Sequence, residues 1–281
     1  MNAAIIDQRL ETLVPHNSAL STAVRYSLLA PGKRLRPLLV LTTVEMLGGD
    51  PSHALDPACA IEMIHNYSLI HDDLPCMDDD DLRRGLPTLH KVAGDAMALL
   101  AGDFLLTYAF EILTKAPHLT PEQRLALIEA LAYRAGGQGM IGGQAIDITV
   151  TGQAIDEPTL VQMHLGKTGA LLTACLEIAA IITSAPTTIL RQLQKLGADL
   201  GLAYQFLDDL LNATSTTALL GKQAGSDANH SKPTAITLFG VEGTKHRLLQ
   251  LKQSIEEQLR EFAHTGFHHL IQKLLKFNET P

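Results

Sequence analysis

Apolar residues recur at three- and four-residue intervals along almost the whole chain, whereas the apolar–polar alternation typical of a strand is hard to find. Clusters of Pro, Gly and Ser interrupt this helical pattern. They fall at residues 15–18, 31–32, 48–51, 75–87, 117–121, 151–158, 184–186 and 221–233. The segments between them suit helices of about three to seven turns. We therefore predict an all-α fold, a bundle of long antiparallel helices.

Two of the predicted helices, 57–74 and 187–211, are apolar on nearly every side, which predicts that they lie at the centre of the bundle. Each apolar run ends in a pair of acids: Asp72 and Asp73 in the first helix, Asp208 and Asp209 in the second. Ionised carboxylates are rarely buried unless they are paired or bind a metal. Neighbouring carboxylates suit Mg²⁺, whose coordination is usually completed by water and substrate phosphates. The two acidic pairs therefore predict magnesium binding.

The composition predicts one globular domain spanning residues 1–281, because no linker divides it and 46% of the 281 residues are apolar. A net charge of −8 and the absence of Trp argue against a nucleic-acid partner. The longest apolar stretch, 171–182, is interrupted by Glu177 and is shorter than the ~20 residues that cross a bilayer. Three scattered cysteines and a charged N-terminal segment complete the expectation of a soluble, cytoplasmic protein without a membrane span.

The segment 71–85, HDDLPCMDDDDLRRG, carries the densest charge in the chain. The run from Asp78 to Asp81 is by itself compatible with a solvated loop. Arg83 and Arg84 follow at once, and two guanidiniums beside a metal site favour recognition of a phosphate. A calcium loop is excluded by spacing, because the sixth position counted from Asp78 is not Gly and the twelfth, Leu89, is not Glu. The segment predicts a site for magnesium and a diphosphate.

Other polar candidates carry weaker signals. His65 lies seven residues before Asp72, which places both on one face of the helix about 10 Å apart. Lys33 and Arg36 share a face at the start of a helix, where free N–H groups also attract anions. The remaining basic candidates, each equally compatible with a surface position, are Lys167, beside Thr168 and Gly169, and Lys222.

Three glycines, Gly137, Gly139 and Gly142, spell the GxGxxG pattern of dinucleotide-binding proteins. They follow the helical stretch LALIEALAYRA instead of a strand, so the nucleotide interpretation is rejected. Small residues here favour close approach of helices or bending of the backbone near a ligand.

Taken together, these segments resemble the trans-prenyl diphosphate synthases of the farnesyl diphosphate synthase group. The resemblance runs from about residue 30 to 240 and rests on motifs in the family's order: GKRLRP, DDLPCMD, RRG, GGQAID, KTG and YQFLDD. It implies a helical fold around a deep central cavity, a homodimer, and head-to-tail joining of isopentenyl diphosphate to dimethylallyl or geranyl diphosphate with Mg²⁺.

The resemblance also implies roles for individual residues. Asp72, Asp78 and Asp208 would hold magnesium against the allylic diphosphate, with Asp73 supporting the metal cluster. Residues matching the allylic site are Arg83, Lys167, Thr168, Gln205, Lys222 and Lys232. Residues matching the isopentenyl diphosphate site are Lys33, Arg36, His65 and Arg84. The departing diphosphate would gain charge that these cations meet, and no protein nucleophile is needed.

Tyr67 lies five residues before Asp72, about 7.5 Å down the helix, where a growing chain would meet it. An aromatic residue at this position resembles family members that stop at fifteen carbons. The resemblance therefore implies farnesyl diphosphate as the product.

The second acidic motif departs from the family's pattern of DDxxD followed by Gly-Asp, because Asn212 and then Ser215 and Thr216 stand where acids are expected. The stretch after Lys232 reads PTAI and lacks the family's aromatic–proline pair. We expect an active enzyme with weaker magnesium binding on this side. The alternatives are a different product length, or a silent paralogue that binds an active synthase. A terpene cyclase would not need the Lys33, Arg36 and His65 set.

Overall fold

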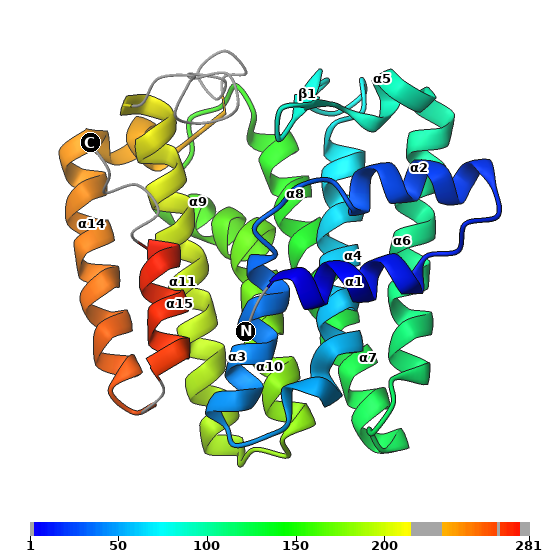
Figure 1. The fold of residues 1–281 in the computed structure, drawn as a ribbon. Coiled ribbons are helices and arrows are strands. Elements are labelled where there is room, and N and C mark those ends of the chain that lie inside the picture. Colours follow the sequence, from blue (N-terminus) through cyan, green and yellow to red (C-terminus); the bar gives the residue numbers. More distant parts are fainter. Residues whose placement is uncertain (1–2, 215–231, 263–264, 276–281) are drawn as a thin grey trace.

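The computed structural model describes residues 3–214, 232–262 and 265–275, and it confirms the predicted all-α class (Figure 1). The helices are α1 (Ala3–Leu13), α2 (Ala19–Leu28), α3 (Leu35–Met46), η1 (Pro51–Ala54), α4 (Leu55–Asp72), α5 (Leu89–Ala93), α6 (Asp95–Lys115), α7 (Pro121–Ala135), α8 (Met140–Val150), α9 (Glu157–His164), the π-helical η2 (Leu165–Gly169), α10 (Ala170–Ile182), α11 (Thr187–Thr214), α14 (Ala235–Leu259) and α15 (Thr265–Leu275). One small hairpin, β1 (Leu82–Arg83) antiparallel to β2 (Leu86–Pro87), lies in the acidic segment.

The predicted helix breaks at 15–18, 31–32, 48–51, 75–87, 117–121, 151–158 and 184–186 all separate helices in the structure. α14 and α15 are separated by a further break, after Leu259, that was not predicted. Two more unpredicted breaks lie at glycines. Gly94, at φ 84°, separates α5 from α6, and residues 136–139 separate α7 from α8. Each is a short glycine turn within an otherwise helical apolar pattern, so periodicity alone did not reveal it.

The core confirms one of the two predicted central helices and corrects the other. α4 is buried on nearly every side, and Ile61, Met63 and Ile64 are fully inaccessible to solvent. α11 instead buries one face, and its first half exposes polar residues such as Arg191 and Lys195 to solvent. The second all-round buried helix is α10, which packs against α11, α3 and α7. Its sequence is the more continuously apolar of the two, because α11 carries a charged stripe at helical spacing.

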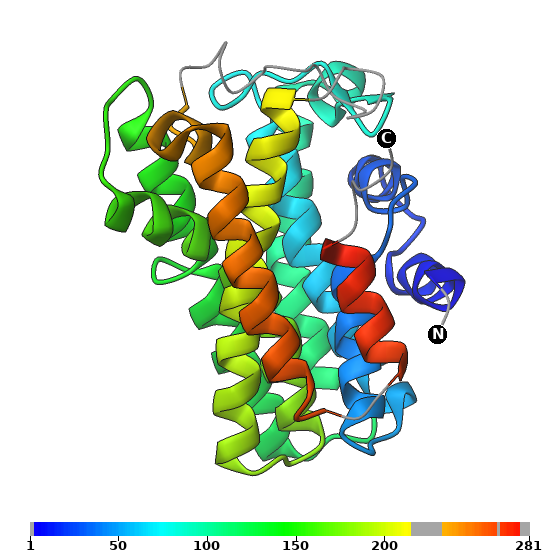
Figure 2. The same ribbon diagram turned by 90° about the vertical axis from the view of Figure 1, so that its left-hand side faces the viewer.

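The two acidic motifs lie at the same end of the bundle. α4 and α11 run in the same direction and both finish at the upper end in Figure 1, where the β1–β2 hairpin and the first turn of α14 also lie. α1 and α2 cross the long helices, and the view in Figure 2 shows them together at one side. Side chains at this end therefore come from segments far apart in the sequence.

Among the residues that the structure describes, two segments are long and apolar enough to cross a membrane by length and composition alone. In Glu157–Ile182 the apolar window is 72% buried inside the bundle, as expected for a core helix of a globular protein. In Asp95–Lys115, which is α6, the window is only 39% buried. Its exposed residues include Leu99 and Leu100, so this helix presents an apolar face to its surroundings.

Candidate active site

The first acidic motif begins where α4 ends. The backbone N–H of Asp78 donates to the carbonyl of Asp72 at 2.9 Å, which folds the loop back over the helix end and brings the two carboxylates together. Burial, opposed by Lys167 and aided by Asp78, raises the pKa of Asp72 to about 6. A carboxylate held in this way gains from a bound cation, because the cation restores the ionised form.

Asp73, the next residue, forms an ion pair with an arginine. Its Oδ1 accepts hydrogen bonds from both Nε and Nη2 of Arg83, and Arg83 also donates to Asp80 at 2.9 Å. Burial raises the pKa of Asp73, although Arg83 opposes it. Asp73, predicted to support the metal, and Arg83, predicted to bind the diphosphate, thus form an ion pair. This contact fits a supporting role for Asp73.

Lys232 connects the first motif to the opposite wall. Its Nζ lies 2.8 Å from Oδ1 of Asp78 and 3.9 Å from Oδ2 of Asp147. Asp147 is 4% exposed and also accepts a hydrogen bond from Nζ of Lys167. A pocket of about 390 Å³ opens here, lined by Cys76, Met77, Asp78, Asp147, Ile148, Thr151 and Lys232.

Asp147 was not among the predicted site residues. The sequence signal for Asp147 is its place in GGQAID, a motif that supports the family resemblance without indicating a role for its acid. In the structure Asp147 holds the two lysines, Lys167 and Lys232, that face the first motif. It is therefore a component of the site.

Lys167 and Thr168 lie on η2, a π-helical turn that glycines hold from two sides. A Cβ on Gly143 of α8 would lie 2.0 Å from the backbone nitrogen of Lys167, and one on Gly201 of α11 would lie 2.2 Å from Cα of Gly169. Such contacts require glycine. At Gly139 and Gly142 an added Cβ would instead meet the backbone oxygens of Arg134 and Gly137, so these two glycines serve the bend between α7 and α8. Single π-helical turns are frequent at functional sites.

The two acids of the second motif, Asp208 and Asp209, differ in burial and in their contacts. Asp208 is half-buried, whereas Asp209 is 3% exposed and points into the bundle. Asp209 accepts from Nε2 of Gln205 at 3.0 Å and from the backbone N–H of Ala235 at 2.7 Å. Gln205 in turn accepts from the hydroxyl of Thr168 at 3.0 Å. These bonds link η2, α11 and the start of α14.

His164 adds to this arrangement and was also missed from the sequence. Its Nε2 lies 3.4 Å from Oδ2 of Asp209, and the pair is almost completely buried. Asn212, which stands at the position expected to be acidic, is 5% exposed one turn further along α11. Lys222, Ser215 and Thr216 lie outside the described residues.

The residues predicted to bind the second diphosphate gather on one side. A Cβ on Gly32 would lie 2.6 Å from Nη1 of Arg84, so the loop that precedes Lys33 touches this guanidinium. The pKa of Lys33 is lowered by burial and then by Arg84. Nε of Arg36 is buried and has no hydrogen-bond partner among the described residues, so it is a donor available to an anion.

His65 lies among these cations. Its pKa is lowered well below the ordinary value by burial and then by the charges of Arg36 and Arg84. The imidazole is therefore neutral and can donate a hydrogen bond without adding charge. Arg34, the remaining cation of GKRLRP, is instead buried and held by Asp7 and Glu62, which makes it structural.

Tyr67 lies on α4, one and a half turns before Asp72, and is 4% exposed. Burial, with a smaller contribution from Asp72, raises its pKa to about 12, so the phenol stays neutral. Its ring packs edge-on against His71 with centroids 5.7 Å apart. This places a bulky ring beneath the first motif, as the sequence predicted from helical spacing.

Within the described part of the chain, no three carboxylate, imidazole or thiol side chains converge closely enough to hold a metal on their own. The donor set nevertheless fits magnesium, because Asp72, Asp78 and Asp208 offer oxygen ligands and Mg²⁺ usually keeps water and substrate phosphate in its shell. The raised pKa of Asp72 is consistent with a carboxylate that awaits a cation.

The chain is similar to known proteins over most of its length. It is 48% identical over 243 residues to a farnesyl diphosphate synthase of Geobacillus stearothermophilus, covering 86% of this chain and 82% of the relative. It is 42% identical to a chloroplastic geranylgeranyl pyrophosphate synthase of Capsicum annuum, covering 92% and 70%.

A solved geranyltransferase of Helicobacter pylori, complexed with magnesium and isoprenyl diphosphate, superimposes with a TM-score of 0.88 at 31% identity, covering 98% of this chain and 94% of that one. The model of the family described as polyprenyl synthetase matches residues 17–266. With its two acidic helix ends and its two groups of cations, the chain belongs to the polyprenyl synthetase family.

Proposed function

We propose that the protein is a short-chain prenyltransferase that condenses isopentenyl diphosphate with dimethylallyl or geranyl diphosphate to give farnesyl diphosphate. The observation that supports this proposal is that the cations gather in two separate groups, each suited to an anion. One is formed by acids and the lysines Lys167 and Lys232, and the other by Lys33, Arg36 and Arg84. A single-substrate diphosphate enzyme needs only the first.

The first site suits the allylic diphosphate. Bound Mg²⁺ would join Asp72, Asp78 and Asp208 to the diphosphate and offset the charge on the leaving oxygens. Lys167 donates a hydrogen bond to Asp147, and Lys232 donates one to Asp78 with Asp147 3.9 Å away, so both lysines lie at this space and can transfer their hydrogen bonds to phosphate oxygens. Preorganised cations stabilise the charge that develops as the allylic C–O bond breaks.

The second site suits isopentenyl diphosphate. Arg36 offers a buried donor without a partner among the described residues, and Lys33 and Arg84 add positive charge. A neutral His65 contributes a hydrogen bond without increasing repulsion among the cations. The double bond of the second substrate then attacks the allylic cation, and the departed diphosphate is the acceptor of the proton that is lost.

The product length follows from Tyr67. Its ring stands beneath the first motif and limits the space for a chain that grows along α4. Farnesyl diphosphate synthases and a geranylgeranyl pyrophosphate synthase are both relatives at more than 40% identity. The bulky ring favours the shorter product.

A homodimer is supported by the exposed apolar residues of three neighbouring helices, α6, α7 and α8. These residues are Leu99, Leu100, Leu125, Tyr133, Ile141 and Ile148. A second copy of the chain would cover them, and a Leu100→Glu variant should then sediment as a monomer where the wild type sediments as a dimer. The free cysteines Cys59, Cys76 and Cys175 suit the reducing cytoplasm.

The test is to incubate the purified protein with Mg²⁺, isopentenyl diphosphate and each allylic diphosphate, and to determine product chain length by chromatography. Farnesyl diphosphate is expected, with loss of activity in Asp72→Asn and Asp78→Asn. A twenty-carbon product would contradict the proposed product length and keep the proposed reaction. No product at any magnesium concentration would favour the silent paralogue.

A further inference from the structure

The cations of the isopentenyl diphosphate site come from two segments that are distant in the sequence. Lys33 and Arg36 lie just after α2, in the loop and first turn that lead into α3. Arg84 lies in the turn of the β1–β2 hairpin. The site is complete only when the hairpin is held against the end of α2.

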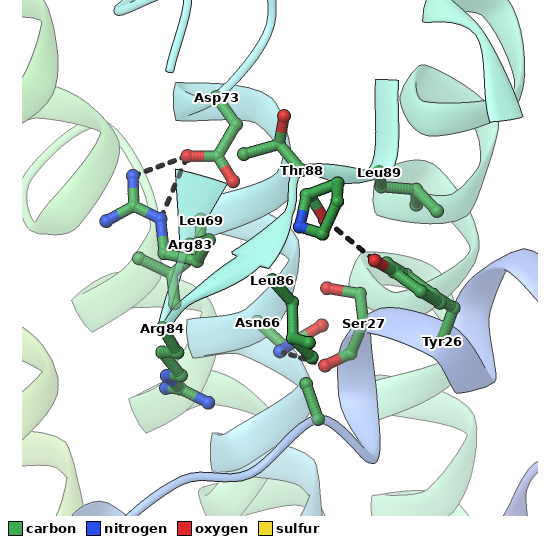
Figure 3. Close-up of a pocket in the computed structure, with 12 residues that line it drawn as sticks. Tyr26, Ser27, Asn66, Leu69, Asp73, Arg83, Arg84, Leu86, Thr88 and Leu89 are labelled. Carbon is green, nitrogen blue, oxygen red and sulfur yellow. Dashed lines mark hydrogen bonds and ion pairs between the residues drawn. The ribbon is translucent and has the colours of Figure 1, made fainter. Parts of the chain in front are cut away.

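Tyr26 joins the two segments. From α2 its hydroxyl donates a hydrogen bond to the carbonyl of Pro87 in β2 at 2.9 Å, across 61 positions of sequence (Figure 3). Pro87 pairs with Leu82 across the hairpin, and Arg83 with Leu86, so the bonded strand lies directly beside the one that leads into Arg84. The tyrosine therefore fixes the hairpin to the segment that carries Lys33.

Packing alone leaves this junction incomplete. A pocket of about 30 Å³, room for one or two waters, lies between α2 and the hairpin and is lined by residues of both, including Tyr26 and Arg84. Asn66 lines the same pocket, and its Oδ1 has no hydrogen-bond partner within the described segments. A direct hydrogen bond across a loosely filled contact carries more of the positional restraint than it would in a close-packed one.

The two arginines of the hairpin are fixed in different ways. Arg83 is held by its own side chain, through Asp73 and Asp80. Arg84 forms no ion pair with any residue in the described part of the chain, and its backbone has φ 56° in a two-residue turn with Gly85 at φ 80°. A non-glycine residue in this left-handed conformation depends on the surrounding structure. Arg84 is therefore positioned by the backbone of the hairpin.

Electrostatics adds a reason for restraint. Burial lowers the pKa of Arg84, Glu62 opposes this shift, and the neighbouring arginines add to it; Arg84 in turn lowers the pKa of Lys33. These like charges repel one another before a diphosphate arrives. Something must hold the hairpin in place against that repulsion.

We propose that Tyr26 is a positioning residue for isopentenyl diphosphate, which keeps Arg84 beside Lys33 and Arg36 in the free enzyme by holding the hairpin at Pro87. The inference rests on the proposed assignment of the two diphosphate sites. Loss of the Tyr26 hydrogen bond should affect only the isopentenyl diphosphate site, because Arg83 of the allylic site keeps its ion pairs with Asp73 and Asp80.

The test is the Tyr26→Phe variant, which removes one hydroxyl and keeps the ring. The KM for isopentenyl diphosphate should rise about three- to ten-fold, the range that a net hydrogen bond of ordinary strength accounts for. The KM for the allylic substrate should change less than about two-fold. The ratio of variant to wild-type KM for isopentenyl diphosphate should fall as ionic strength rises, because salt screens the repulsion.

The matched control is Tyr108→Phe, which removes a hydroxyl of α6 that donates to the backbone carbonyl of Leu13 at 2.6 Å, a bond of the same kind between other segments. It should leave both KM values unchanged, whatever its effect on the thermal midpoint. An unchanged KM for isopentenyl diphosphate in Tyr26→Phe, or an equal rise in both KM values, overturns the proposal even if the wild type makes farnesyl diphosphate.

The proposal and the proposed function fail differently. If the wild type binds isopentenyl diphosphate in a calorimeter but forms no product, the function is wrong, and the affinity of Tyr26→Phe still decides the role of Tyr26. If the wild type binds no isopentenyl diphosphate, both are overturned.

Discussion

Oδ2 of Asp209 accepts the backbone N–H of Ala235 at 2.7 Å, and this bond ties the first turn of α14 to α11. Lys232 precedes that turn by three residues and reaches Asp78 on the opposite wall. An acid of the second motif thus positions a cation of the first site through the backbone. This role differs from metal binding and requires a buried carboxylate.

Asp209→Asn should separate these functions. The amide can accept only on one atom and presents N–H groups to Gln205 or Ala235, which are themselves donors. Leaving a buried donor unpaired should lower the free energy of unfolding by about 1–3 kcal/mol. We expect kcat to fall about ten-fold or more, an order-of-magnitude expectation for a misplaced catalytic cation, measured in steady-state assays.

The control is Asp199→Asn. Asp199 also ties α11 to α14, through Ser254 and Gln258, but far from the acidic motifs. This variant should lose stability and keep its kcat. A normal kcat in Asp209→Asn would show that Lys232 does not depend on this bond.

Lys232→Met tests the cation directly. Nζ of Lys232 lies 2.8 Å from Asp78, and its removal takes away the partner of that acid together with the proposed diphosphate ligand. We expect kcat to fall about 10²-fold, as for the loss of one preorganised group at a developing charge. Lys232→Arg should recover part of the activity. Lys195→Met, at an exposed position of α11, is the control and should match the wild type.

Tyr67→Ala should lengthen the product beyond farnesyl diphosphate, because it removes the ring beneath the first motif. It should also cost about 3 kcal/mol or more in stability, as for a large-to-small change in a core. Tyr67→Phe isolates the ring from the hydroxyl, whose oxygen has no hydrogen-bond partner among the described residues. It should keep both product and stability. Chromatography of the products decides, and an unchanged chain length in Tyr67→Ala would contradict this role.

The sequence predicted much of this architecture because its signals are local. Helix breaks follow from Pro and Gly, and the acidic candidates at 72, 73, 78 and 208 follow from the apolar runs that they succeed. The central position of α10 was not predicted, because the apolar run that precedes Asp208 and Asp209 made α11 the stronger candidate. The charged stripe of α11 shows that one face meets solvent.

Other features depend on contacts between distant segments. Asp147 of α8 and His164 of α9 gain their contacts only when these helices pack against η2 and α11, and Tyr26 contacts a residue 61 positions away. No periodicity or spacing encodes such pairs. The division of labour between Asp208 and Asp209 likewise follows from which side of α11 faces α14.

His65 predicts a pH dependence of stability. Its pKa in the folded state lies well below the value of 6.5 that an unfolded chain has, because burial and arginines disfavour the imidazolium. The unfolded chain therefore binds the proton first as pH falls. The stabilisation is complete above pH 6.5 and is lost below it, with a slope of at most about 1.4 kcal/mol per pH unit.

Urea unfolding between pH 5 and 7.5 measures this contribution. His65→Gln should show a shallower loss of stability below pH 6.5 than the wild type. His246→Gln, at an exposed position of α14, should follow the wild type. Parallel curves for His65→Gln and wild type would mean that His65 titrates normally in the folded protein.

We expect Asn212 to decide how strongly the second motif binds magnesium. It lies one turn beyond Asp208 on α11, about 6 Å along the helix, and is 5% exposed. Asn212→Asp adds a charge one turn beyond Asp208 and Asp209 on the same helix. Without metal it should lower the free energy of unfolding by about 1–3 kcal/mol, because a buried carboxylate beside others is costly. With Mg²⁺ and an allylic diphosphate analogue, stability should recover, and the magnesium concentration for half-maximal activity should fall about three- to ten-fold as ligand charge increases.

Asn212→Ala, which adds no charge, should show no such gain. A magnesium dependence identical to that of the wild type in Asn212→Asp would show that this position does not reach the metal.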